Sequence, residues 1–232
     1  MADNYYVQLN NLGCRFYLRN GLRRPQAVNA LSDISFRFDK GEKLGIIGSN
    51  GAGKSTLLHI MAKTLNPNYG KIYFHNQPRI SLMTLTPGFS PNNSGRENAI
   101  LSCIMLGLTR KQALQRLPQI ADFAELGIWM NNPLRTYSSG MRTRLGLAIT
   151  LSVAPDILLV DETLSIGDQQ LKRKSQEAIN SHIQGANTTV IVSHNLDIIN
   201  DMCTRVIWLH HGRIMGDGPC AVILDKYKQW CE

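Results

Sequence analysis

The sequence lacks three features that would assign it to a special class. None of its five cysteines forms a Cys-x-x-Cys pair, so neither a disulfide framework nor a zinc site is indicated, and we expect reduced thiols in a cytosolic protein. The most apolar long window, residues 99–108, is far shorter than the stretch of about 20 residues that a membrane-spanning helix needs. Residues 1–4 begin no basic and then apolar leader, so we expect a soluble chain without a signal peptide.

Charge is unbalanced, because 25 lysines and arginines stand against 17 acidic residues, which gives a net charge of +8. Such an excess is compatible with a nucleic acid, an acidic membrane surface or an anionic small ligand as partner. The densest basic group, residues 19–24, is expected to be a solvated loop, with a patch near anionic lipid headgroups as the alternative. With 43% hydrophobic residues, the chain is able to form a substantial core.

The stretch GSNGAGKST at residues 48–56 has few large side chains and follows a short apolar run. Its glycines Gly48, Gly51 and Gly53 let the backbone approach a ligand closely and turn several amides into one hollow, which attracts an anion. Residues 55–62 are predicted to be helical, and the helix dipole adds positive potential at the same place. The order strand, G-x-x-x-x-G-K-[ST], helix is that of a P-loop, which binds a nucleoside triphosphate with Mg²⁺.

Two side chains of this loop are assigned to the phosphates and the metal ion. Lys54 would bring a full positive charge to the outer phosphates, and the hydroxyl of Ser55 would hold Mg²⁺. A flexible glycine-rich turn is the alternative, but the flanking strand and helix favour the nucleotide site.

A second group of polar residues follows residues 157–160, a wholly apolar run that is typical of a strand buried on both faces of a sheet. The run ends in Asp161 and Glu162, and ligands bind at the carboxyl ends of strands in open α/β sheets. We expect Asp161 to reach the Mg²⁺ shell and Glu162, which points the other way along an extended chain, to orient a water molecule for in-line attack. A pair of acidic residues at the start of a solvated loop is the alternative.

A third run, residues 188–192, is rich in β-branched residues and is followed by Ser193 and His194. From the end of such a strand, His194 would bond a γ-phosphate. Taken alone, this histidine would more simply cap the helix that is predicted over residues 195–202.

The segment Tyr137-Ser138-Ser139-Gly140 is predicted to be a turn with hydroxyl caps before a helix over residues 141–153. A helix start preceded by Ser and Gly is a second anion site. Because one monomer has little room for two such sites on one nucleotide, we expect a symmetric dimer in which the P-loop of one copy faces the serine turn of the other. The predicted apolar face of the helix comprises Met141, Leu145, Ala148, Ile149 and Ser152.

The order of the predicted elements indicates an α/β fold with a helical insertion. Residues 1–87 and 151–232 should form an α/β core with an N-terminal antiparallel β portion, and residues 88–150 should form a helical subdomain. The predicted helices of the insertion and of the C-terminal region lie over residues 98–108, 110–126, 141–153 and 221–230.

The order of these motifs resembles that of the nucleotide-binding subunit of an ABC transporter. The motifs are GSNGAGKST, YSSGMR, ILLVDE, SIGD and VSH, and the resemblance covers residues 7–215. YSSGMR, FAELG and PNNSGREN are similar to the subfamily that exports the polysaccharides of capsule, O-antigen and teichoic acid, and the capsule-export subunits are the closest in length. The resemblance implies a P-loop NTPase fold and the hydrolysis of ATP with Mg²⁺.

The resemblance also implies roles for individual residues. Phe16, just after the first strand, or its neighbour Tyr17 would stack on adenine. Ser139 and Gly140 would contact the ATP of the partner subunit. The phosphate contacts would come from Gly48, Ser49, Asn50, Gly51, Ala52, Gly53, Lys54, Ser55 and Thr56.

Four further roles follow from the same resemblance. Asp161 would serve Mg²⁺ through water, Glu162 would be the general base, and His194 would sense the γ-phosphate. The loop from Ser165 to Asp168 would cross the dimer seam, with Asp168 counted among the nucleotide-binding residues.

One departure from the family pattern concerns the metal. Most such subunits carry a glutamine roughly 40 positions after the P-loop lysine, but this chain has no glutamine between Gln77 and Gln112. Leu85 stands in its place, so the hydroxyl of Thr84 or Thr86, a water molecule or a local shift would have to fill the role. The polysaccharide-export subfamily also tends to lack this glutamine.

These implications give one main hypothesis. Two copies of the chain would bind ATP, close and drive a separate integral membrane permease, with the helical insertion as the docking surface at the cytoplasmic face of the membrane. One alternative is an ABC-type ATPase that acts on nucleic acid or ribosomes, although the single P-loop and the lack of sustained heptads disfavour it. The other alternative is the ATPase of another ABC exporter. A non-hydrolysing nucleotide binder is disfavoured because Glu162 and His194 are both present.

Overall fold

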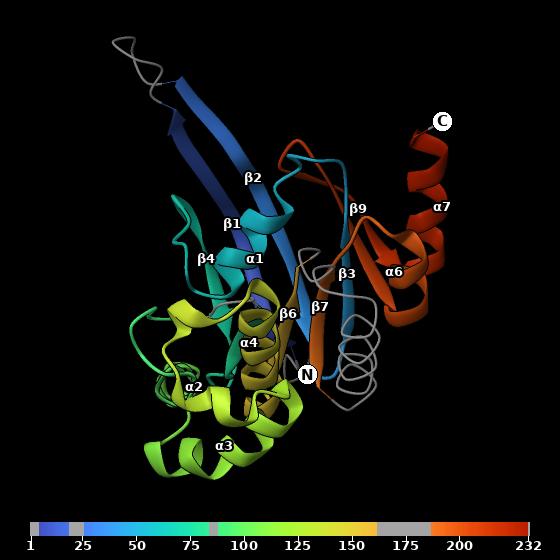
Figure 1. Ribbon diagram of the computed structural model, residues 1–232. Coiled ribbons are helices and arrows are strands. Elements are labelled where there is room, and N and C mark those ends of the chain that lie inside the picture. Colours follow the sequence, from blue (N-terminus) through green and yellow to red (C-terminus); the bar gives the residue numbers. More distant parts are fainter. Residues whose placement is uncertain (1–4, 19–25, 84–87, 162–186, 232) are drawn as a thin grey trace. The chain divides into compact units, whose positions relative to one another are not determined.

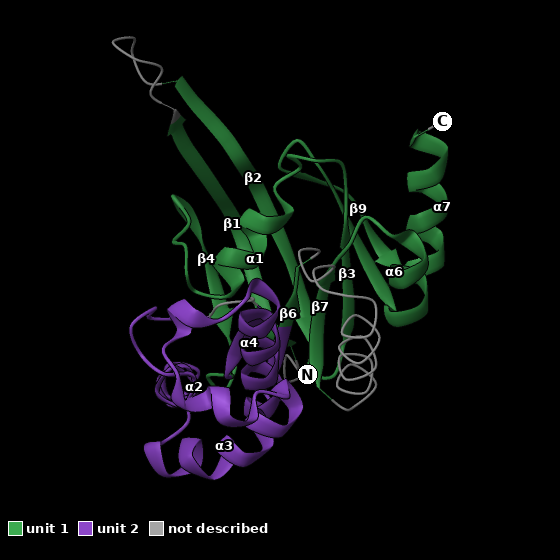
Figure 2. Cartoon of the chain, viewed as in Figure 1, with its two compact units in different colours: residues 1–78, 159–162, 186–232 green, residues 79–158, 163–185 purple. Residues whose placement is uncertain are grey.

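The computed structural model describes residues 5–18, 26–83, 88–161 and 187–231. The chain divides into two compact units, which Figure 2 distinguishes by colour. Unit 1 is built on sheets and unit 2 mainly on helices. The boundaries are residues 1–78, 159–162 and 186–232 for unit 1, and residues 79–158 and 163–185 for unit 2.

Unit 1 contains an antiparallel three-stranded sheet with the order β2-β1-β4. Strand β1 (Tyr5–Leu18) pairs with β2 (Gln26–Asp39) on one side and with β4 (Tyr69–Phe74) on the other (Figure 1). Along β2, buried and exposed residues alternate from Ile34 to Phe38, which is the pattern of a sheet with one face against a core. The predicted antiparallel β portion at the N-terminal end is therefore confirmed.

The second sheet of unit 1 carries the predicted core strands, in the order β6-β7-β3-β8-β9. Strand β3 runs parallel to both β7 and β8, whereas β9 is antiparallel to β8. Every residue of β6 and β7 is buried, as expected for central strands covered on both faces. The bounds are Lys43–Ile47 for β3, Ile157–Val160 for β6, Thr188–Val192 for β7, Arg205–His210 for β8 and Arg213–Pro219 for β9.

The described residues of unit 1 form three helices: α1 (Lys54–Met61), α6 (Leu196–Met202) and α7 (Cys220–Cys231). Helix α6 is capped by the side chain of Asn195, which accepts from the amides of Asp197 and Ile198. The interpretation that His194 caps this helix is therefore wrong. Helix α7 agrees with the C-terminal helix predicted over residues 221–230.

Unit 2 begins with β5 (Ile80–Met83) and continues with α2 (Gly95–Met105), α3 (Arg110–Ala124) and α4 (Ser139–Val153), with two short 3-10 helices between α3 and α4. Helix α2 starts three residues earlier than predicted, because Ser94 and Glu97 form a capping box. The 3-10 helices are η1 (Gly127–Asn131) and η2 (Leu134–Thr136).

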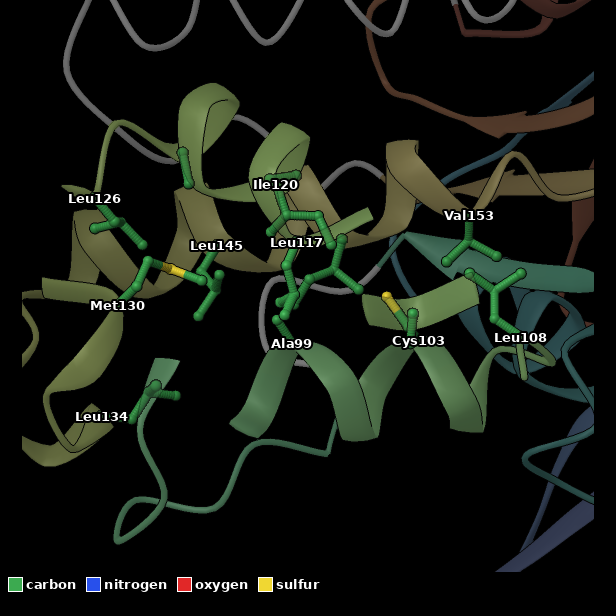
Figure 3. Close-up of a cluster of buried hydrophobic side chains, with 14 of the residues drawn as sticks. Ala99, Cys103, Leu108, Leu117, Ile120, Leu126, Met130, Leu134, Leu145 and Val153 are labelled. Atoms are coloured by element: carbon green, nitrogen blue, oxygen red, sulfur yellow. The ribbon is translucent and has the colours of Figure 1, made fainter. Parts of the chain in front are cut away.

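The core of unit 2 is formed by helices α2, α3 and α4 (Figure 3). Side chains such as Cys103 of α2, Ile120 of α3 and Leu145 of α4 meet in one buried cluster. Because α4 packs against neighbours on nearly all sides, Gly146 and Leu147 are buried in addition to most of the predicted apolar face. Among the described residues, no helix has both the length and the apolar character that a membrane span requires.

Candidate nucleotide site

Glycines shape the loop between β3 and α1 at two close approaches. At Gly48 (φ +146°), a Cβ atom would collide with the carbonyl oxygen of Leu209. At Gly53 (φ +100°), a Cβ atom would lie 2.5 Å from the carbonyl oxygen of Ala30 and 2.7 Å from the Leu31 side chain. Only glycine fits these positions without a shift, and the loop therefore packs tightly against β2 and β8.

The amides of this loop form an anion-binding hollow. The amide of Ala52 is used inside the loop, where it donates to Ser49 (3.1 Å), and the amide of Leu57 begins the ladder of α1 by donating to Gly53 (2.9 Å). Gly53 caps α1 without any side-chain hydrogen bond. Within the described part of the chain, the amides with no backbone acceptor include those of Gly51, Gly53, Ser55 and Thr56. Such donors at a helix N-terminus fit a triphosphate.

Lys54 places its charge inside the loop. Its side chain is only 7% exposed, and Nζ donates to the carbonyl oxygens of Gly48 (2.7 Å) and Ser49 (2.9 Å). An ammonium group has three donors and no acceptor, so these two bonds fix its position next to the amide hollow.

His194 lies beside this ammonium group. Strands β3 and β7 are parallel and Ile46 pairs with Val192, so the segments that follow the two strands leave the sheet at the same edge. Nζ of Lys54 and Nε2 of His194 are 3.5 Å apart. Because the ammonium can only donate, this contact is a hydrogen bond only in the tautomer that carries the ring proton on Nδ1.

The structure describes both predicted ligands of the metal ion, Ser55 and Asp161. Asp161 is half-buried directly after β6, and Ser55 is exposed in the first turn of α1. In residues 5–18, 26–83, 88–161 and 187–231, no group of three metal-ligating side chains occurs. Mg²⁺ commonly keeps several waters and uses one or two protein oxygens plus phosphates, so the absence of a three-residue group in these ranges is compatible with the predicted pair of Ser55 and Asp161. The predicted residues outside the described ranges are Glu162, Ser165, Asp168 and Leu85 with its neighbours Thr84 and Thr86.

The structure gives the two candidate adenine-stacking residues, Phe16 and Tyr17, different exposures. Both lie inside β1 and not after it as predicted, because β1 extends to Leu18. Phe16 pairs with Val28 and Tyr17 with Ala27, beyond a register shift between Cys14 and Arg15 in the β1–β2 pair. The Phe16 side is the more sheltered of the two, because Phe16 is 39% exposed and Tyr17 is 64% exposed.

The serine turn begins a helix two residues earlier than predicted. Ser138 is the N-cap of α4, and its hydroxyl accepts from the amide of Met141 (3.2 Å). Ser139 and Gly140 are consequently the first two helical residues and not part of the turn. Among the described residues, the only atom within 4 Å of a Cβ atom at Gly140 would be the Ser138 hydroxyl oxygen, 3.9 Å away.

Tyr137 has a role that its sequence motif does not reveal. Its ring is buried, and its hydroxyl donates to the carbonyl oxygen of Trp129 (2.5 Å). Burial raises the pKa of this phenol above its ordinary value. A Cβ atom at Gly95, the first residue of α2, would collide with the same hydroxyl. Tyr137 thus joins the start of α4 to η1 and α2 within unit 2.

Comparison with known proteins assigns the family. The sequence model described as ABC transporter matches residues 31–165, which include the P-loop, the serine turn and Asp161. The chain belongs to the ABC transporter family.

Relatives with curated names refine this assignment. The O-antigen export system ATP-binding protein RfbB of Klebsiella pneumoniae is 40% identical over 200 residues, which are 86% of this chain and 81% of that protein. The teichoic acids export ATP-binding protein TagH of Bacillus cereus is 40% identical, and the match covers 97% of this chain and 43% of that protein. TagH of Listeria monocytogenes is 38% identical, and the match covers 90% of this chain and 62% of that protein. The chain therefore spans about half the length of the TagH relatives. The predicted resemblance to polysaccharide-export subunits is confirmed, whereas closest similarity to capsule export stays a prediction.

Solved structures confirm the fold. A dimeric ATP-binding cassette in a post-hydrolysis state, bound to ADP and Pi, matches with a TM-score of 0.72 at 24% identity, over 92% of this chain and 98% of that chain. An ATP binding subunit of an ABC transporter matches with a TM-score of 0.75 at 20% identity, over 96% and 93%. The predicted P-loop α/β architecture is therefore correct.

Proposed function

We propose that this chain is the ATP-hydrolysing subunit of an ABC exporter that moves a cell-surface polysaccharide through a separate integral membrane permease. The observation that carries the proposal is the similarity to the Klebsiella O-antigen export ATP-binding protein over 86% of the chain, with Lys54 and His194 in contact beside an amide hollow. The nucleic-acid alternative gains no support from these relatives.

The ligands of this site are ATP and Mg²⁺. The open amides of the loop and the ammonium of Lys54 supply positive potential for the phosphates. Ser55 and Asp161 would hold the metal ion, which when bound neutralises charge on the phosphates.

Hydrolysis is assigned to residues at the ends of two strands. His194, which follows β7 and lies 3.5 Å from the ammonium of Lys54, would donate a hydrogen bond to the outer phosphate. Glu162, the residue after Asp161, would orient the attacking water as a general base. In a homodimer, Ser139, Gly140 and Asp168 of the second copy would complete each nucleotide site.

Unit 2 offers a surface for the permease at the cytoplasmic face of the membrane. Large apolar side chains are exposed on α2, where Met105 is 72% exposed, and on η1, where Ile128 is 83% exposed. The amide of Gly95 at the start of α2 donates to Asn132, the C-cap of η1, whereas Met105 is the last residue of α2. Groups of exposed apolar side chains mark protein interaction sites, and we take the group toward the end of α2 as the docking surface. The other members of this surface are Leu101 and Ile104.

Substitution of Glu162 by Gln tests the catalytic part of the proposal. The amide keeps the size of the side chain but cannot accept a proton, so we expect ATP binding to persist and steady-state hydrolysis to be abolished. Asp225→Asn, on the exposed side of α7, is the control and should hydrolyse ATP normally. Normal turnover by Glu162→Gln would refute the role of this carboxylate.

Substitution of Met105 by Glu tests the docking part. A charge on this apolar surface should abolish co-purification with a co-expressed permease subunit, while the ATPase activity of the isolated subunit is retained. Met215→Glu, which changes an exposed methionine of unit 1 (52% exposed), is the control and should co-purify. Equal recovery of the permease with both variants would show that this surface is not the docking surface.

A further inference from the structure

The turn between β8 and β9 is bonded to the P-loop. The amide of Gly212 donates to the carbonyl oxygen of Ala52 (3.1 Å), and the carbonyl oxygen of Gly212 accepts from the amide of Ser32 on β2 (2.8 Å). Through one residue, the turn therefore ties the middle of the P-loop to β2.

The bond to Ala52 determines the direction of the next amide. Among the described residues, all peptide bonds are trans, and in a trans peptide the C=O and N–H groups point in opposite directions. Because the carbonyl of Ala52 points to Gly212, the amide of Gly53 points away from Gly212. This amide is one of those that meet no backbone acceptor within the described residues. The turn thus holds one donor of the anion-binding hollow in a fixed orientation.

The turn is able to make this bond only because residue 212 is glycine. Gly212 has φ +74°, and a Cβ atom would lie 2.6 Å from the carbonyl oxygen of Ala30 and 3.1 Å from Cα of Leu31. Its neighbour His211 also has a positive φ, +46°, so the whole turn is held in a conformation that side chains disfavour. Any side chain at position 212 would push the turn away from β2 and from Ala52.

We propose that Gly212 is a positioning residue of the nucleotide site, whose peptide aims the Gly53 amide at the phosphates and so sets the affinity for nucleotide. The inference rests on the proposed function, because it assumes that the loop binds ATP. A fixed donor binds an anion more tightly than one that must be ordered on binding.

The test compares Gly212→Ala with Gly70→Ala. Gly70 also has a left-handed conformation (φ +80°), and a Cβ atom there would lie 2.5 Å from Cα of Leu12, so the steric clash of an alanine at position 70 is at least as severe as at position 212. It belongs to β4, however, and its surroundings are those of β1 and not of the P-loop. The measurements are the dissociation constant for a fluorescent ATP analogue and the melting temperature without nucleotide.

We expect both variants to melt at a lower temperature but only Gly212→Ala to bind the analogue about tenfold more weakly, which corresponds to ~1.4 kcal/mol. Wild-type affinity in Gly212→Ala, or an equal loss in Gly70→Ala, would overturn the inference. If Gly212→Ala is insoluble, Gly212→Asn replaces it. Asn tolerates positive φ but still carries the Cβ atom that meets Ala30, so the same loss is expected and wild-type affinity would again overturn the inference.

Failure of the proposed function has a different signature. If the wild-type chain does not bind the analogue, or binds it unchanged after Lys54→Ala, the nucleotide site itself is wrong. If the wild-type chain binds it and Lys54→Ala does not, while Gly212→Ala binds normally, only the role of Gly212 is wrong.

Discussion

Nζ of Lys54 lies 3.5 Å from Nε2 of His194, although 140 positions separate the two residues in the chain. The parallel pairing of β3 with β7 brings them together, since each follows the end of its strand. Two motifs that are separate in the sequence thereby form one site. The contacts of this ammonium include two carbonyl oxygens and an imidazole nitrogen, which are neutral acceptors. A phosphate oxygen would be a stronger acceptor than any of these.

Substitution of Lys54 by Ala should weaken ATP binding by about tenfold to a hundredfold, because a hydrogen bond to a charged group contributes ~1.5–3 kcal/mol. Steady-state hydrolysis should fall with it. The measurements are equilibrium binding of a fluorescent ATP analogue and phosphate release. Lys71→Ala on β4, which removes an exposed lysine of unit 1, controls for net charge and should leave both unchanged. Unaltered affinity and turnover in Lys54→Ala would contradict the assignment of the loop.

Tyr137 and Gly95 should be energetically coupled. Tyr137→Phe removes the hydrogen bond to Trp129 and should lower the free energy of unfolding by ~1–3 kcal/mol, since a carbonyl oxygen loses this donor. Gly95→Ala should also destabilise, because the new methyl group collides with the phenol oxygen. The double variant lacks that oxygen. Its loss of unfolding free energy should therefore be smaller, by ~0.5–3 kcal/mol, than the sum of the losses of the two single variants. Denaturant unfolding of the four proteins measures the coupling, and strict additivity would refute it.

Local motifs explain which parts of the fold were predictable. The strand–loop–helix order around residues 48–56 is specified by glycine, lysine and an apolar run within twenty positions, and it was predicted correctly. The same holds for β6 and β7, whose bounds agree with the apolar and β-branched runs. Where the sequence pattern was weaker, the boundaries shifted. Apolar periodicity alone does not show that Ser94 and Ser138 are the caps of α2 and α4, so both helices begin earlier than expected.

Contacts between segments that are distant in the chain could not be predicted from the sequence. Nothing near Gly212 indicates that its amide meets Ala52, because the bond arises only once β8 is packed beside β3. Phe16 was placed after the first strand because the hairpin partner that extends β1 could not be identified from the sequence. For Glu162 and Asp168, which lie outside the described residues, the roles stay predictions.

Thiol reactivity should be confined to one cysteine of the native chain. Burial raises the pKa of the Cys203 thiol to about 12, and burial likewise raises the pKa values of Cys14, Cys103 and Cys220. Since the thiolate is the nucleophile, these four thiols should react slowly, whereas Cys231 is exposed. Mass spectrometry after brief alkylation near pH 8 should find one modified cysteine natively and five after unfolding. Cys231→Ser should abolish native labelling, and rapid modification of a second thiol would contradict the packing around it.

The capping boxes of α2 and α3 provide a matched pair for pH dependence. In α2, Glu97 accepts from the amide of Ser94 (2.8 Å), and in α3, Gln112 accepts from the amide of Thr109 (2.9 Å). The geometry is the same, but only Glu97 titrates. The hydrogen bonds from the Ser94 backbone and side chain lower the pKa of Glu97 below its ordinary value of 4.5.

A lowered pKa in the folded state means that the carboxylate stabilises α2 fully above pH 4.5 and that this contribution is lost as the pH falls through the folded pKa. The difference in melting temperature between the wild type and Glu97→Ala should therefore shrink from about pH 7 to about pH 3. The corresponding difference for Gln112→Ala should stay constant, because an amide does not titrate in this range. Thermal unfolding followed by circular dichroism at each pH decides the matter. Parallel profiles for the two variants would show that the charge of Glu97 contributes nothing to the cap beyond what a neutral acceptor supplies.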